Sequence, residues 1–114
     1  MVSSKLFKGF FKSVVLKLLK DEGPMYGYQI IGKVKLMTNN KLSISYGALY
    51  PILHKLKKEG ALITASEHKN NRLRIYYALT PKGHSLCAAK LKELHEFSES
   101  LQMIVQHKPE LNHG

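Results

Sequence analysis

Phenol, imidazole and ammonium groups gather on one side of the segment that runs from Ser43 to Leu62. The apolar residues of this segment follow the i, i+3, i+4, i+7 spacing of the buried side of a helix, at Leu49, Ile52, Leu53 and Leu56. The opposite side carries Tyr46, Tyr50, His54, Lys55 and Lys58. These groups hydrogen-bond to phosphates and base edges, and a helix fits the major groove of DNA. The pattern favours nucleic-acid recognition over its alternative, an ordinary amphipathic helix with a solvated charged side.

A second basic segment follows the helix. Arg72 and Arg74 alternate with Leu73 and Ile75, so that both arginines share one face of a predicted strand. This spacing indicates a phosphate-binding edge. Tyr26 opens another predicted helix, where free backbone N–H groups attract a phosphate.

The formal net charge of +10 is unevenly distributed. Residues 1–82 hold 15 basic and 4 acidic residues, a net of +11, whereas residues 83–114 hold 3 basic and 4 acidic residues, a net of −1. A polyanionic partner fits such a field, with nucleic acid ahead of an anionic membrane surface. Residues 83–114, with their slightly negative net charge, are expected to serve a function other than binding this polyanion.

The elements that must position these side chains alternate between two periodicities. Helices are predicted over residues 5–21, 26–37, 45–59 and 80–107, a short extended piece over 42–44, and two strands over 62–67 and 73–79. Ser45 and Thr80 are expected N-caps, Gly60 is the expected C′ residue, and Asn70-Asn71 tolerates the left-handed conformation of a hairpin tip. Pro51 conflicts with the third helix, either because that helix starts later or because its first turn is splayed.

The order of elements predicts a mainly α fold with a small β-hairpin. It is a winged helix-turn-helix plus a C-terminal dimerisation helix. We assign residues 1–80 to the winged helix-turn-helix domain for DNA binding, and residues 81–114 to the dimerisation helix and tail.

Two apolar stripes exceed what the core of one such domain covers, one on the first helix and one on the last. Burying both between two chains predicts a two-fold homodimer. The expected dimer contacts are Phe7, Phe10, Phe11, Leu91, Leu94, Phe97, Leu101 and Ile104.

Three motifs then match a known family in order and spacing. PMYGYQI, ISYGALYPILHKLKKEGAL and YYALTPKG resemble the signatures of the PadR family of transcriptional regulators, and LFKGFFKSVVLKLL resembles the start of its first helix. The resemblance covers residues 6–84. It implies a homodimeric DNA-binding regulator, usually a repressor, that a small-molecule effector or another cue releases from its operator. The single cysteine, Cys87, fits a reducing cytoplasm, and a two-fold dimer with two reading helices requires an inverted-repeat operator.

With this resemblance, residues 45–59 become the helix of the major groove and residues 69–74 the wing. The expected DNA contacts are Tyr26, Ser43, Ser45, Tyr46, Gly47, Tyr50, His54, Lys55, Lys69, Arg72 and Arg74. Two departures stand out. The wing tip lacks the family's Gly and Pro, and the chain has no tryptophan with which some relatives sandwich flat ligands.

Other functions fit the residues less well. A winged-helix adaptor that binds protein does not need the strongly positive first part of the chain. A metal or redox sensor would use Cys87 with His84 and His95, although a lone buried cysteine is more often a small apolar residue. No catalytic set, cofactor motif, signal peptide or membrane span is visible, so we expect no enzyme activity and no membrane partner.

Overall fold

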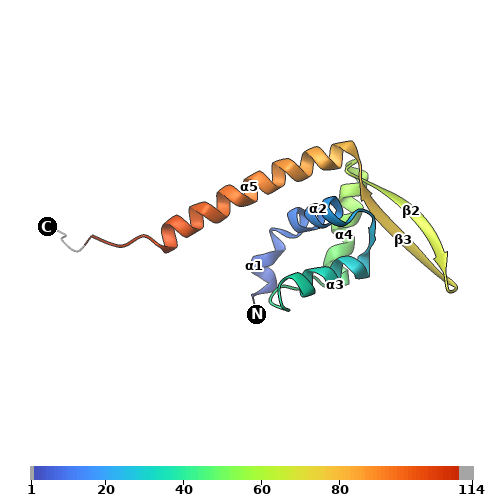
Figure 1. The fold of residues 1–114 in the computed structure, drawn as a ribbon, viewed down its shortest axis with the longest axis horizontal. Helices are drawn as coiled ribbons and strands as arrows, with labels where there is room; N and C mark the ends of the chain where they lie inside the picture. Colours follow the sequence, from blue (N-terminus) through green and yellow to red (C-terminus); the bar gives the residue numbers. More distant parts are fainter. Residues whose placement is uncertain (1, 111–114) are drawn as a thin grey trace.

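The computed structural model describes residues 2–110, and residues 111–114 of the predicted tail lie outside this range. Five helices and three strands make up the described part of the chain (Figure 1). Their bounds are α1 (Ser4–Lys8), α2 (Phe11–Glu22), β1 (Met25–Tyr26), α3 (Gly27–Met37), α4 (Tyr46–Lys58), β2 (Leu62–Lys69), β3 (Arg72–Leu79) and α5 (Pro81–Val105). This is the predicted mainly helical winged helix-turn-helix with a long C-terminal helix.

The predicted first helix is divided in two at Gly9 and Phe10. Gly9 is a poor helix former, and Phe10 has φ −112° and ψ 2°, outside the helical range. The break brings the rings of Phe7 and Phe11 edge to face, with their centroids 4.8 Å apart. Both rings are buried in the chain's own core, so they lack the spare surface for a second chain that we had expected there. Of the three phenylalanines expected at the dimer contact in this part of the chain, Phe10 is the one that stays partly exposed.

The predicted extended piece at residues 42–44 is not a strand. The third strand is instead β1, which pairs antiparallel with β3 at Met25↔Tyr77 and Tyr26↔Tyr76, giving the order β1-β3-β2. Residues 42–44 are held by the burial of Ile44 and by the backbone N–H of Leu42, which donates to the side-chain hydroxyl of Thr38 at 3.1 Å. The apolar residues Leu42 and Ile44, which the sequence suggests as a short extended piece, instead anchor the loop between α3 and α4 to the core.

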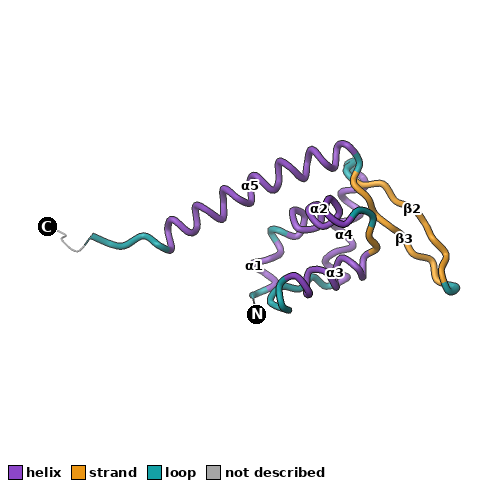
Figure 2. Tube along the Cα trace, in the orientation of Figure 1, coloured by secondary structure: helices purple, strands orange, loops and turns teal. Residues whose placement is uncertain are grey.

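The β2–β3 hairpin is longer and tighter than predicted (Figure 2). Its strands pair from Leu62↔Leu79 out to Lys69↔Arg72, which leaves a turn of only two residues. Asn70 and Asn71 have φ of 53° and 62°, the left-handed values that a type I′ turn requires and that asparagine tolerates. The predicted role of this asparagine pair is confirmed.

Helix α4 begins and ends as its caps predict. The Ser45 hydroxyl accepts the N–H of Ala48 at 3.2 Å, and Gly60 has a φ of 82° just after the helix. Leu49, Leu53 and Leu56 are buried on one side. Pro51 lies inside the helix, so the later start that we considered is wrong; its solvent-exposed position is where a missing backbone hydrogen bond costs least.

Helix α5 has an inner part that packs on the body and an outer part that extends beyond it. Thr80 caps the helix by accepting the Gly83 N–H at 3.0 Å, and Cys87 is fully buried against α2 and the core. The outer part runs away from the bundle, in the direction opposite to the hairpin (Figure 1). The molecule therefore measures 72 × 30 × 21 Å, and none of its described helices is long and apolar enough to cross a membrane.

Candidate nucleic-acid interface

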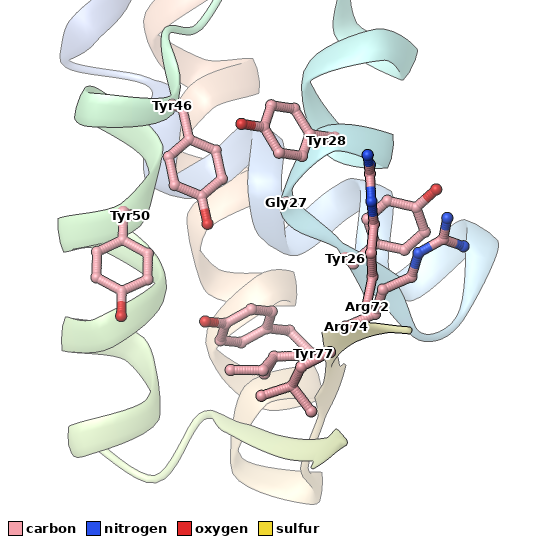
Figure 3. Close-up of a pocket in the computed structure, with 10 residues that line it drawn as sticks. Tyr26, Gly27, Tyr28, Tyr46, Tyr50, Arg72, Arg74 and Tyr77 are labelled. Carbon is pink, nitrogen blue, oxygen red and sulfur yellow. The ribbon is translucent and has the colours of Figure 1, made fainter. Parts of the chain in front are cut away.

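Four aromatic side chains form a continuous exposed row across α3 and α4, and Figure 3 shows the three tyrosines among them. The ring centroids of Tyr28 and Tyr46 lie 4.9 Å apart and those of Tyr46 and Tyr50 5.9 Å apart, both nearly parallel, and His54 meets Tyr50 edge-on at 4.5 Å. We call Tyr28, Tyr46, Tyr50 and His54 the aromatic row. The exposed fractions of the three tyrosines are 69%, 43% and 41%. From the sequence alone, one of the Tyr46 and Tyr50 rings could pack against the core, and Tyr28 is expected in the core. The structure excludes the first possibility and contradicts the second, because all three rings are exposed.

The row follows from helical spacing and from one glycine. Tyr46, Tyr50 and His54 stand four residues apart, so they lie above one another on α4. The Tyr46 ring passes so close to Gly27 that a Cβ there would be 2.9 Å from ring atom Cε2. Only a glycine at the start of α3 leaves room for this ring.

The wing places one of its two arginines, Arg74, against β1. The Arg74 guanidinium carbon lies 4.8 Å from the centroid of the Tyr26 ring, a cation–π contact, and Tyr26 also meets Tyr76 edge to face at 5.4 Å. Arg72 is exposed nearer the tip and lies opposite Lys69 in the ladder. The two arginines alternate with Leu73 and Ile75, as the sequence predicts.

A hollow of about 410 Å³ separates the row from the wing. Tyr46 and Tyr50 line it from α4, whereas Arg72, Arg74 and Tyr26 line it from the sheet (Figure 3). Its remaining lining residues are Gly27, Tyr28, Leu73, Ile75 and Tyr77. Phenol hydroxyls on one wall and guanidinium groups on the other give it hydrogen-bond donors on both sides, which suits a phosphate backbone.

The Tyr77 side chain adds no charge to this hollow near neutral pH. Burial, reinforced by the nearby Tyr50 and Tyr46 hydroxyls, raises the pKa of Tyr77 above its ordinary value near 10. The Tyr77 phenol therefore remains neutral, and the positive charge of the arginines stands without a local anion from this ring.

The other predicted contact residues lie outside the hollow. Ser43 and Ser45 line a separate depression of about 530 Å³, together with Lys5 and Lys8 of α1. Gly47, His54, Lys55 and Lys69 are exposed on α4 or β2. Whether any of these residues contacts DNA stays a prediction.

Sequence reasoning missed Tyr28 and Gly27 as members of this surface. The signal that could have found Tyr28 is helical phase. Ile30, Ile31 and Val34 mark the inward side of α3, and Tyr28 lies off that side. Nothing in the sequence indicates that Gly27 faces a ring from another helix.

The predicted dimer contacts divide along α5. Leu91 and Leu94 are partly buried against the body, and the Phe97 ring lies 5.5 Å from that of Phe10. Phe97 is nevertheless 46% exposed. Farther out along the helix, Leu101 is 45% exposed and Ile104 is 73% exposed. The outer part of the helix thus presents a row of apolar side chains to solvent.

The metal and redox reading finds little support in the part of the chain that the structure describes. Within residues 2–110 no three His, Cys, Asp or Glu side chains lie close enough to hold a metal ion. The sensor reading required an exposed Cys87, whereas the thiol is buried, and burial raises its pKa. A protonated, inaccessible thiol is a poor ligand and a poor nucleophile.

Comparison with known proteins agrees with the resemblance in the motifs. Residues 15–89 match the transcriptional regulator PadR-like family. A transcriptional regulator from Clostridium thermocellum shares 26% identity at a TM-score of 0.81, over 90% of this chain and 100% of that one. A PadR-like transcription factor from Bacteroides fragilis shares 30% identity at a TM-score of 0.69, over 89% and 95%. An uncharacterised protein from Lysinibacillus sphaericus is 28% identical over 93% of this chain and 97% of its own.

Proposed function

Because the chain belongs to the PadR-like family of transcriptional regulators, which bind DNA, we propose that it is a homodimeric repressor of an inverted-repeat operator. In this proposal α4 is the recognition helix in the major groove, and the β2–β3 hairpin is the wing against the backbone. Residues 1–80 bind DNA, and residues 81–114 join the two chains. The protein acts in the cytoplasm, and a small-molecule effector or another cue releases the operator.

The observation that carries the proposal is the hollow between the aromatic row and the wing. Its tyrosines and arginines come from four separate elements, β1, α3, α4 and β3, and their hydrogen-bond donors converge on one open surface. Residues 1–82, which contain all of this surface, carry the net charge of +11. Phosphate contacts from such a surface supply most of the affinity for DNA.

The homodimer is supported by the outer part of α5. Exposed apolar side chains that recur along one helix favour a partner helix, and a second copy gives a closed, symmetric arrangement. Two copies of α4 related by a two-fold axis would read half-sites about 34 Å apart, one turn of DNA. The operator should therefore be an inverted repeat.

The proposal is tested on the DNA upstream of the gene and its neighbours. Inverted repeats found there are compared with the same fragments after one half-site is scrambled, in gel shifts at a fixed salt concentration. We expect the intact repeat to bind roughly 1000-fold more tightly than unrelated DNA. A reporter gene behind the repeat should be transcribed less when the protein is present; increased transcription would make it an activator instead.

A protein-binding adaptor is the remaining alternative. It predicts no fragment that binds better than its scrambled control, and no steep dependence of binding on salt. That result would overturn the proposed function.

A further inference from the structure

We infer that the three consecutive residues Tyr26, Gly27 and Tyr28 position the recognition helix and the wing relative to each other. They would act through two side chains, Tyr46 on α4 and Arg74 on β3, which they touch from opposite ends of the segment. The inference rests on the proposed function and adds to it a set of residues that control DNA binding without supplying the main contacts.

Tyr26 holds the wing end of this segment. Its backbone pairs with Tyr76 across the β1–β3 ladder, and its N–H donates to the Gln29 side chain at 3.0 Å. The Tyr26 backbone is therefore fixed by the sheet and by the start of α3, and its ring meets Tyr76 edge to face at 5.4 Å. Arg74 lies over this ring at 4.8 Å, so the direction of its guanidinium depends on where the ring stands.

Gly27 and Tyr28 hold the recognition-helix end. The Tyr28 ring stacks on Tyr46 at 4.9 Å with an angle of 22° between their planes. Gly27 lets the same Tyr46 ring approach the backbone, because any Cβ there would collide with it at 2.9 Å. Tyr46 is thus confined between two consecutive residues of another helix.

The two contacts are joined by the shortest possible connection. Tyr26 ends β1 and Gly27 begins α3, with no loop between them. A shift of this backbone would therefore move Arg74 and Tyr46 together, and these residues stand on opposite walls of the hollow. The segment acts as a fixed spacer whose length sets the width of the DNA-binding surface.

The wing end is tested by the salt dependence of operator binding. Arg74→Ala should make the slope of log K against log salt less steep by about 0.9, because each phosphate contact contributes about that much to its magnitude. Tyr26→Leu, which removes the aromatic face, should reproduce part of that loss, whereas Tyr26→Phe, which keeps the face beneath Arg74, should show less of it than Tyr26→Leu does. The double variant of Tyr26→Leu and Arg74→Ala should bind no more weakly than Arg74→Ala alone.

The recognition-helix end is tested by a second double-mutant cycle. Tyr28→Ala should weaken operator binding roughly three- to tenfold, the usual effect of an aromatic pair. Combined with Tyr46→Ala it should add little, because the role of Tyr28 passes through that ring. Tyr28→Phe keeps the stack and loses only the hydroxyl, so it should weaken binding less than Tyr28→Ala does. Gly27→Ala must displace the Tyr46 ring and should weaken the operator more than random DNA.

Thermal unfolding of each variant is measured alongside, so that loss of fold is not read as loss of contact. Additive effects in both cycles would overturn the inference, as would Phe variants that lose binding like Leu or Ala, since the hydroxyls would then contact DNA directly. If Arg74→Ala and Tyr46→Ala themselves leave binding unchanged, the proposed DNA surface fails and the inference fails with it. If the single variants weaken binding but their effects add in the double variants, the inference is wrong while the proposed DNA surface stands.

Discussion

The two arginines of the wing share one face of β3, and Arg74 also lies over the ring of Tyr26. Replacing Arg72 and Arg74 together with alanine should weaken binding on every DNA sequence alike. Each lost phosphate contact removes about 0.9 from the salt slope. Titrations at several salt concentrations measure this slope.

The matched control is Lys92→Ala, which removes an exposed charge from α5, away from the hollow. It should leave the slope as it is. An arginine pair whose loss changes neither affinity nor slope would show that the wing does not touch DNA.

Cys87 has a different consequence, because it is fully buried and burial raises the pKa of its thiol. The folded protein should resist thiol reagents near pH 8, whereas the chain in denaturant should react at once. The unfolded thiol loses its proton at a lower pH than the folded one. The free energy of unfolding should therefore be highest below the ordinary thiol pKa near 8.5 and fall as the pH rises above it. Rapid labelling of the folded protein would revive the redox reading.

The sequence predicts part of the candidate site, and the other part depends on packing between elements. Tyr46, Tyr50, Arg72 and Arg74 line one hollow, because helix and strand periodicities fix which side chains share a face. Gly27 could not be predicted, since its need for a missing Cβ arises from a ring on another helix. Contacts of that kind are set by packing and leave no periodic signal.

At the scale of elements, Gly83 controls how closely α5 approaches the turn before the hairpin. A Cβ at this position would overlap the carbonyl oxygen of Ala61, which also accepts the N–H of Thr80 at 3.0 Å. Gly83→Ala should therefore destabilise the fold by about 1–3 kcal/mol, as overpacking does. Thermal unfolding gives the measurement.

Gly32 provides the matched control, because it also lies within a helix but a Cβ there meets nothing within 4 Å. Gly32→Ala should stabilise the protein by up to about 1 kcal/mol through helix propensity. Equal effects of the two substitutions would contradict the close packing of α5 on the turn.

The elements with strong local signals were predicted correctly, and those without were not. Ser45, Gly60 and Thr80 act as caps because their chemistry is local. The short strand was placed at residues 42–44, yet it forms at Met25–Tyr26, since a two-residue strand is defined by its partner β3. The break between α1 and α2 likewise follows from packing the rings of Phe7 and Phe11.

At the scale of the whole molecule, the outer part of α5 predicts the assembly. Phe97→Asp and Leu101→Asp place a charge on half-exposed apolar positions, so they should dissociate a dimer without unfolding the domain. Sedimentation at micromolar concentration measures the mass, and specific operator binding should be lost with the dimer.

Lys92→Asp introduces the same side chain at an exposed position outside this apolar stripe and should leave the dimer intact. A protein that sediments as a monomer at micromolar concentration, yet binds its inverted repeat tightly, would overturn the two-fold arrangement.

The outer part of α5 extends past the bundle, and beyond Phe97 its apolar residues Leu101, Met103, Ile104 and Val105 are exposed in the single chain. If a second copy supplies its support, the amount of protein in the cell becomes a control signal. Association is second order, so occupancy of the operator would rise more steeply than total protein does. A small increase in synthesis could then switch the target gene, and dilution at cell division could release it.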